Sequence, residues 1–187
     1  MDVKESNIVS EFKKGFLQIY TGDGKGKTTA AVGIAVRAAG DGLKVIMVQF
    51  LKGGATGELN SAKLLAPNFV IKRFEKPRGF FWTLNEEEKS ELKKEIGEAY
   101  DFCSSSLKEH GCDILILDEV MGALNNKLIS IEQINDLISF KPDNMELILT
   151  GRNAPQSIID KADLVTEMKQ VKHYFEQGVS ARKGIEY

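Results

Sequence analysis

Short apolar runs alternate along the chain with longer segments in which apolar residues recur at helical spacing. The runs predict strands at 16–20, 44–50, 69–74, 113–117, 145–150 and 164–168. The longer segments predict helices at 28–39, 57–66, 85–109, 130–139 and 155–161. This regular alternation of strands and helices is typical of βαβ units, in which each helix crosses from one strand to a parallel neighbour.

Two of the runs, Val45–Val48 and Ile114–Leu117, are apolar at every position. Strands of that kind are buried on both faces, as in a parallel sheet with helices on either side. We therefore expect an α/β fold with a mainly parallel sheet of about six strands, covered by helices on both faces. We also expect residues 15–187 to form a single domain with an irregular tail after residue 170. Residues 1–14 are expected to form an N-terminal arm that is mobile or takes part in dimer contacts.

Composition narrows the class of protein. The 187 residues carry a formal net charge of −2, so the surface as a whole gives no sign of binding nucleic acid or an anionic membrane. The two cysteines, Cys103 and Cys112, are too few for a disulfide framework. The first 14 residues contain no apolar signal-sequence core, and no apolar run approaches the ~20 residues of a membrane span. We expect a cytoplasmic protein.

A glycine-rich loop between the first strand and the first helix carries the strongest chemical signal. Strand, glycine-rich loop, Lys-Thr and helix is the order that builds a binding site for a polyphosphate. Backbone N–H groups, the helix start and Lys27 supply positive charge, and Thr28 offers its hydroxyl to Mg²⁺. The expected ATP contacts are Gly22, Asp23, Gly24, Lys25, Gly26, Lys27, Thr28 and Thr29.

The loop departs from the general pattern in one place, because Thr21 stands where that pattern has glycine. The alternative interpretation is a glycine-rich turn that binds no ligand. Lys25 has its own alternative as a solvated loop charge. The three alternating glycines before Lys27 and Thr28 favour the phosphate site.

The apolar run at 113–117 ends in two acids, Asp118 and Glu119. Ligands of open α/β sheets bind beyond the carboxyl ends of the strands, so these acids should face the glycine-rich loop. A carboxylate there can hold Mg²⁺, which takes few protein ligands and keeps several waters. The alternative is that the acids only cap a following helix. Two predicted strands separate the loop strand from this one, which favours a RecA-like strand order.

Two arginines are candidates for binding phosphate. Arg152 follows the predicted strand at 145–150, on the same edge of the sheet, and Arg37 lies on the first helix. A guanidinium can bind phosphate through two parallel hydrogen bonds. The alternative for each is a surface ion pair. These features indicate a nucleoside triphosphate and Mg²⁺, yet a hydrolase, a kinase and a transferase could all use them.

The ordered set of motifs resembles the P-loop type of ATP:corrinoid adenosyltransferases over about residues 15–187. The segments that carry the resemblance are Tyr20–Ala31, Gln49–Gly53, Gly79–Trp82, Ile116–Glu119, Leu149–Pro155, Val165–Met168, Lys172-His173, Gly178 and Gly184–Tyr187. The family tolerates Thr21. Arg182 lies where many members carry Gln, which leaves the contacts of the tail open.

The resemblance implies a reaction in which cobalt(I) of a corrinoid attacks C5′ of ATP and the whole triphosphate leaves. Lys27, Thr28, Glu119 and Arg152 are then the catalytic residues. Thr28 and Glu119 would bind Mg²⁺ (or Mn²⁺) directly. Asp118 would act on the metal indirectly, by holding its ligands in place. The resemblance also implies that ATP lies reversed along the loop.

Three aromatic residues follow Gly79. From the sequence alone, ordinary core packing is the plainer interpretation of this cluster. By resemblance, Phe80 and Trp82 pack against the corrin face and exclude the lower axial ligand of cobalt, whereas Phe81 is structural. His173 is expected to serve packing or hydrogen bonding and not to bind cobalt.

The resemblance further implies a flavoprotein reductant and a homodimer. Two other classes stay open. One is a RecA-like ATPase or small-molecule kinase that uses Glu119 as a general base. The other is a non-catalytic binding module gated by nucleotide.

Overall fold

The structure, a computed structural model, describes residues 13–187, so the arm expected at 1–14 lies almost wholly outside the described residues. Six strands form one sheet in which all neighbours are parallel, in the order β3-β2-β4-β5-β1-β6. The strands are β1 (Leu17–Thr21), β2 (Val45–Gln49), β3 (Phe69–Lys72), β4 (Ile114–Asp118), β5 (Glu146–Thr150) and β6 (Leu164–Glu167). Each predicted strand exists, with bounds that differ by one or two residues.

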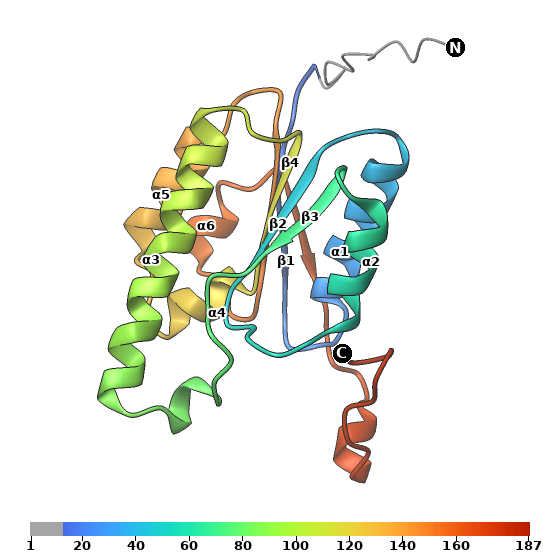
Figure 1. Ribbon diagram of the computed structural model, residues 1–187, viewed down its shortest axis with the longest axis vertical. Helices are drawn as coiled ribbons and strands as arrows, with labels where there is room; N and C mark the ends of the chain where they lie inside the picture. Colours follow the sequence, from blue (N-terminus) through green and yellow to red (C-terminus); the bar gives the residue numbers. More distant parts are fainter. Residues whose placement is uncertain (1–12) are drawn as a thin grey trace.

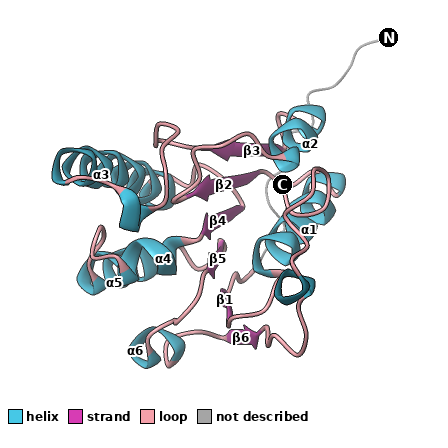
Figure 2. Ribbon diagram, turned by 90° about the horizontal axis from the view of Figure 1, so that it is seen from below, coloured by secondary structure: helices cyan, strands magenta, loops and turns pink. Residues whose placement is uncertain are grey.

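Helices cover both faces of the sheet, as Figures 1 and 2 show. One face carries α1 (Lys27–Gly40) and α2 (Gly57–Leu65). The other carries α3 (Glu86–Lys108), α4 (Val120–Asn125), α5 (Ile131–Phe140) and α6 (Gln156–Ile159). The predicted α/β class is confirmed. Among the helices of residues 13–187, none combines the length and apolarity that crossing a membrane requires.

The short elements were not predicted. These are α4 and two 3₁₀ turns, η1 (Phe81–Thr83) and η2 (Tyr174–Gln177). Helix α4 begins directly after β4, because Glu119 takes a left-handed conformation with φ of 61° and reverses the chain in one residue. Only Glu119 separates the strand from the helix, and the six residues of α4 are too few to show a helical pattern in the sequence.

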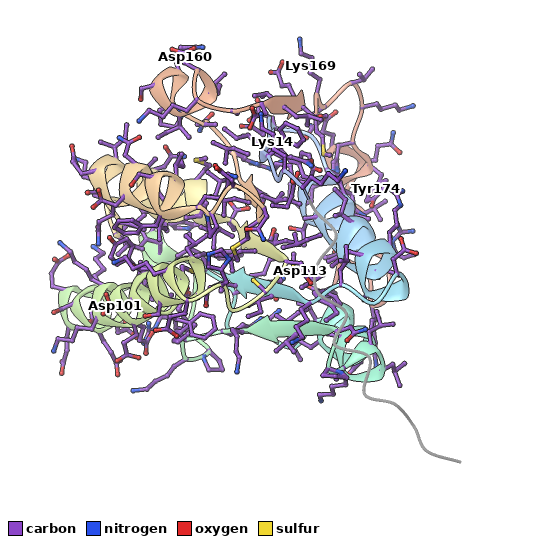
Figure 3. All side chains as sticks on the ribbon, turned by 90° about the horizontal axis from the view of Figure 1, so that it is seen from above. Lys14, Asp101, Asp113, Asp160, Lys169 and Tyr174 are labelled. Carbon is purple, nitrogen blue, oxygen red and sulfur yellow. The ribbon has the colours of Figure 1, made fainter. Side chains whose placement is uncertain are left out.

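The core explains why the central strands are apolar at every position. Leu115 and Leu117 of β4 pack with α3 and α5, whereas Ile114 and Ile116 pack with α1 on the opposite face. Side chains fill the layers on both sides of the sheet (Figure 3). Alternate positions are therefore both inside, and no polar face remains.

The strand order sets where the site is formed. Strand β5 lies between β1 and β4, which confirms the RecA-like arrangement expected from the sequence. All strands are parallel, so the segments that follow β1, β2, β4 and β5 leave the sheet at one edge. Residues far apart in the sequence meet there.

Candidate active site

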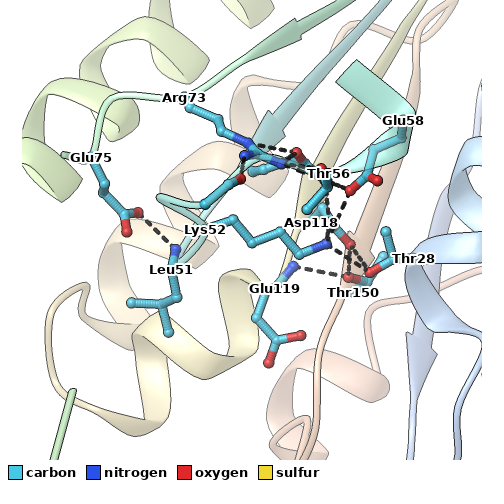
Figure 4. A network of polar contacts seen from close by, with 12 residues as sticks. Thr28, Leu51, Lys52, Thr56, Glu58, Arg73, Glu75, Asp118, Glu119 and Thr150 are labelled. Atoms are coloured by element: carbon cyan, nitrogen blue, oxygen red, sulfur yellow. Dashed lines mark hydrogen bonds and ion pairs between the residues drawn. The ribbon is translucent and has the colours of Figure 1, made fainter. Parts of the chain in front are cut away.

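Polar residues end four of the strands at this edge, namely Thr21, Gln49, Asp118 and Thr150, and all four are buried. A buried polar group is costly unless it is hydrogen-bonded, so their contacts are informative. Asp118 lies at their centre, fully buried. It accepts hydrogen bonds from the side chains of Thr28, Gln49, Lys52 and Thr150 (Figure 4). We call these five residues the Asp118 cluster.

Both carboxylate oxygens of Asp118 accept hydrogen bonds. Its Oδ1 accepts from the hydroxyl of Thr28 at 2.9 Å and of Thr150 at 2.8 Å. Its Oδ2 accepts from Gln49 Nε2 at 3.0 Å and from Lys52 Nζ at 2.8 Å. Four donors fix this carboxylate in place. Asp118 therefore orients Thr28 and has little free capacity to bind a metal directly.

A half-buried arginine extends the cluster towards the loop after β2. Arg73 donates to Gln49 Oε1 at 2.8 Å from Nε and to Thr56 Oγ1 at 2.7 Å from Nη2. These bonds hold the loop that carries Lys52. Neither Lys52 nor Arg73 was assigned a role from the sequence. The signal that could have found Gln49 and Thr150 is an apolar strand whose last residue is polar.

The glycine-rich loop needs its glycines for two reasons. Gly22 and Gly26 have φ of 95° and 122°, a conformation that other residues rarely adopt. A Cβ on Gly22 would lie 2.4 Å from the carbonyl oxygen of Met168, and one on Gly24 would lie 2.7 Å from the same atom. The N–H of Gly24 donates to this oxygen at 2.7 Å, so that amide is already used within the protein.

Lys27 points back into the loop. Its Nζ donates to the carbonyl oxygens of Gly22 at 2.6 Å and Gly24 at 2.8 Å. Burial lowers the pKa of Lys27, and the charge of Arg152 lowers it further, while Glu119 opposes this. The loop therefore concentrates positive charge where a polyanion would be stabilised.

Glu119 differs from its neighbour Asp118. Its N–H donates to Thr150 Oγ1 at 2.9 Å, while its carboxylate points away from the Asp118 cluster (Figure 4). Although Glu119 precedes α4, its side chain makes no capping hydrogen bond, so the capping interpretation fails for this acid. Burial raises the pKa of Glu119, with a further rise from the charge of Asp118. A cation close to Glu119 would stabilise the charged form of its carboxylate.

The donors present suit Mg²⁺. The Thr28 hydroxyl and the Glu119 carboxylate are oxygen ligands beside the loop, and Mg²⁺ is bound through few such groups together with phosphate and water. In residues 13–187, no group of three or more His, Cys, Asp or Glu side chains could hold a metal alone. A metal at this edge would therefore need the phosphates as partners.

A large open cavity of about 1350 Å³ lies over this edge. Its lining includes the loop residues Asp23, Gly24, Lys25, Gly26, Lys27, Thr28 and Thr29, together with Lys52, Glu119, Arg152, Phe80 and Trp82. Gly22 and Asp118 are not among the lining residues. Arg37 is exposed in the last turn of α1 and does not line the cavity, so the structure does not bring it to the loop.

Phe80 and Trp82 form an exposed aromatic pair at the cavity. Their rings are parallel to within 3°, with centroids 4.7 Å apart. The two side chains are 69% and 77% exposed, whereas Phe81 between them packs against the core. The interpretation of Phe80 and Trp82 as ordinary core residues was therefore wrong. Contiguous exposed aromatic side chains beside a cavity are candidates for contact with a ligand.

The C-terminal tail returns to the loop. Glu186 accepts from Lys25 Nζ at 3.0 Å and from the backbone N–H of Arg182 at 2.7 Å, and it also bonds Tyr174. These donors lower the pKa of Glu186, with Arg182 the largest cause. His173 Nδ1 accepts from the N–H of Phe175 at 3.0 Å, in the hydrogen-bonding role expected for it. Lys25 is thus neutralised in part by the tail.

Glu75 links the two sides of the cavity. It lies in the segment that leads from β3 towards the aromatic pair, and its Oε1 accepts from the N–H of Leu51 at 2.7 Å. Burial raises the pKa of Glu75 to about 7, although the Leu51 N–H opposes the shift. This contact ties the loop after β2 to the segment before the aromatic pair.

Comparison with known proteins decides the family. The model of the family described as ATP:corrinoid adenosyltransferase BtuR/CobO/CobP matches residues 13–187. This chain belongs to that family. A corrinoid adenosyltransferase of Escherichia coli (strain K12) is 36% identical over 94% of this chain and 87% of its own length. One from Pseudomonas aeruginosa is 33% identical over 99% of this chain and 90% of its own length.

The assignment makes the chain an enzyme, a corrinoid adenosyltransferase, as the resemblance implied. Among solved structures, the flagellar accessory protein FlaH from Methanocaldococcus jannaschii aligns with a TM-score of 0.49 and 16% identity, covering 82% of this chain and 71% of that one. The family assignment rests on the sequence relatives alone.

Proposed function

We propose that the enzyme transfers the 5′-deoxyadenosyl group of ATP to cobalt(I) of a corrinoid and releases triphosphate, in the biosynthesis or salvage of adenosylcobalamin. The observation that carries the proposal is one cavity with two kinds of lining. A phosphate loop with adjacent acids lies on one side, and an exposed aromatic pair lies on the other. ATP fits the first chemistry and the flat, apolar corrin ring fits the second.

The bond changes balance without a further reactant. An electron pair of cobalt(I) forms the bond to C5′, the C5′–O bond breaks, and its electrons leave with the triphosphate. Cobalt ends as cobalt(III). The step needs no attacking water and no γ-phosphoryl acceptor, so Glu119 is not required as a general base. The ATPase or kinase alternative would instead need Glu119 as the general base.

The protein stabilises the leaving group. Lys27 and Arg152 bring positive charge to the departing triphosphate, and electrostatic stabilisation of developing charge is a large source of catalysis. A charge-assisted hydrogen bond contributes roughly 1.5–3 kcal/mol. Two such bonds that strengthen only in the transition state correspond to about 10²–10⁴ in rate, at ~1.36 kcal/mol per tenfold change.

Thr28 and Glu119 are the residues proposed to hold Mg²⁺ (or Mn²⁺), with Thr28 oriented by Asp118. The metal supplies neutralising charge to the triphosphate. Phe80 and Trp82 are proposed to pack against the corrin and exclude the lower axial ligand, because a filled apolar space admits neither water nor imidazole. That exclusion makes cobalt(II) easier to reduce by a separate flavoprotein. A cytoplasmic homodimer completes the proposal.

Product analysis tests this function. Purified protein is mixed with ATP, Mg²⁺ and chemically prepared cob(I)alamin, and the products are separated. The proposal expects inorganic triphosphate and a light-sensitive alkylcobalamin in equal amounts. ADP with phosphate would support the ATPase or kinase alternative. ATP binding without turnover would support the non-catalytic module.

A further inference from the structure

A lysine lies where the proposed metal site needs a cation. Lys52 Nζ is 2.8 Å from Asp118 Oδ2 and 3.2 Å from Thr28 Oγ1, with Glu58 Oε1 at 3.8 Å. The Thr28 hydroxyl is one of the two ligands assigned to Mg²⁺ under the proposed function. A lysine ammonium therefore contacts an oxygen that the metal would also contact.

The cluster holds Lys52 less firmly than it holds Asp118. Gln49 and Thr150 fix the carboxylate from the buried side, whereas the Lys52 side chain is 25% exposed and lines the cavity. Within the described residues, Lys52 is the charged member among the four donors to Asp118. Its four-carbon chain can swing while its partners stay in place.

Two cations cannot contact the same hydroxyl oxygen without strong repulsion. Binding of Mg²⁺ to Thr28 therefore requires Lys52 to leave that oxygen. A polyphosphate in the cavity offers the displaced ammonium a new anionic partner close by. We propose that Lys52 is the resident cation of the nucleotide-free site and becomes a triphosphate-binding residue when the metal arrives. This rests on the proposed function only for the identity of the metal ligands.

The experiment compares two neutralising variants by calorimetry, with inorganic tripolyphosphate as the probe, with and without Mg²⁺. K52Q should weaken binding of tripolyphosphate at least ~10-fold with Mg²⁺ and less than ~3-fold without it, because the free lysine stays with Asp118 until the metal displaces it. K76Q is the matched control. Lys76 also lines the cavity, but its side chain is 70% exposed and pairs with Glu91.

Three outcomes would overturn the proposal. An equal loss with and without Mg²⁺, or a loss matched by K76Q, would make Lys52 a general attractor of anions. No loss in either condition would leave it a structural ion pair. Binding of Mn²⁺ alone, followed by electron paramagnetic resonance, should strengthen at least ~3-fold in K52Q, since the competing cation is gone.

A measurement on the unaltered protein covers the case in which K52Q fails to fold. A crystal structure with Mg²⁺ and tripolyphosphate should place Lys52 Nζ within ~3 Å of a phosphate oxygen and away from Thr28. If Nζ stays on Thr28 and Asp118 with both ligands bound, the proposal is wrong. These tests need no corrinoid, so they can succeed even if product analysis rejects adenosyl transfer.

Discussion

The Asp118 cluster, through Thr28 and Lys52, and the aromatic pair line the same cavity but are held in opposite ways. Asp118 is fully buried at the strand ends and accepts hydrogen bonds from four side chains. Phe80 and Trp82 lie in a loop, mostly exposed, and stack chiefly on each other. The first region is part of the fold, and the second is added to its surface.

The difference follows from what each region is proposed to bind. A triphosphate is stabilised by charges held in defined positions, and the four hydrogen bonds to the buried Asp118 fix the residues around it. A corrin ring offers a broad apolar face, which exposed aromatic side chains can cover. Changes in the Asp118 region should therefore alter stability and activity together, whereas changes in the aromatic pair should alter activity alone.

The largest effect is expected from K27A. It removes the charge beside the triphosphate and both bonds to the loop carbonyls, so kcat/KM should fall by about 10²–10⁴. Steady-state assays with cob(I)alamin and ATP measure this, with K76A as control. Activity within about threefold of the unaltered enzyme would remove the phosphate loop from the mechanism.

The double variant F80A/W82A tests the second region, the aromatic pair. Transfer from chemically prepared cob(I)alamin should persist, while activity that starts from cob(II)alamin and a reductant should fall at least ~10-fold. Since both side chains are exposed, the free energy of unfolding should change by no more than about 0.5 kcal/mol. Urea unfolding measures the latter. Equal losses in both assays, or a large loss of stability, would make the aromatic pair structural.

A smaller effect is expected from E119Q. The variant keeps the shape of the side chain and loses its charge, so the Mg²⁺ concentration at half-maximal activity should rise at least ~10-fold. E91Q is the control, because Glu91 lies on α3, is 45% exposed and does not line the cavity. An unchanged Mg²⁺ titration would assign Glu119 a role other than holding the metal.

The last prediction concerns Glu75, which joins the two regions, and it is a change in stability with pH, with no change in the chemistry of the reaction. Its pKa is raised from 4.5 to about 7 by burial, so the protonated form favours the folded state. This stabilisation is complete below pH 4.5 and is lost as the pH rises through about 7. E75Q keeps a neutral side chain at every pH. Its free energy of unfolding relative to the unaltered protein should therefore rise from pH 5 to pH 8, by up to about 3 kcal/mol. The same difference at both pH values would contradict the shift.

The same contrast explains how much the sequence could predict. The strands, the main helices and the place of the glycine-rich loop between β1 and α1 were correct because each has a local pattern, as in Ile114–Leu117 and in the glycines before Lys27. The contacts of Lys52 with Asp118 could not be predicted, since they depend on the order of strands that are distant in the chain. Arg37 was a candidate by residue type alone. The exposure of Phe80 and Trp82 was missed because aromatic residues in a row resemble core.

The central claim is that the triphosphate is held as a leaving group while C5′ of the ribose faces the corrinoid. A crystal structure with ATP and Mg²⁺ tests it most directly. The account predicts the triphosphate against Lys27 and the loop, with C5′ facing the space beside Phe80 and Trp82. A γ-phosphate facing that space, or C5′ directed at solvent or buried protein, would contradict it.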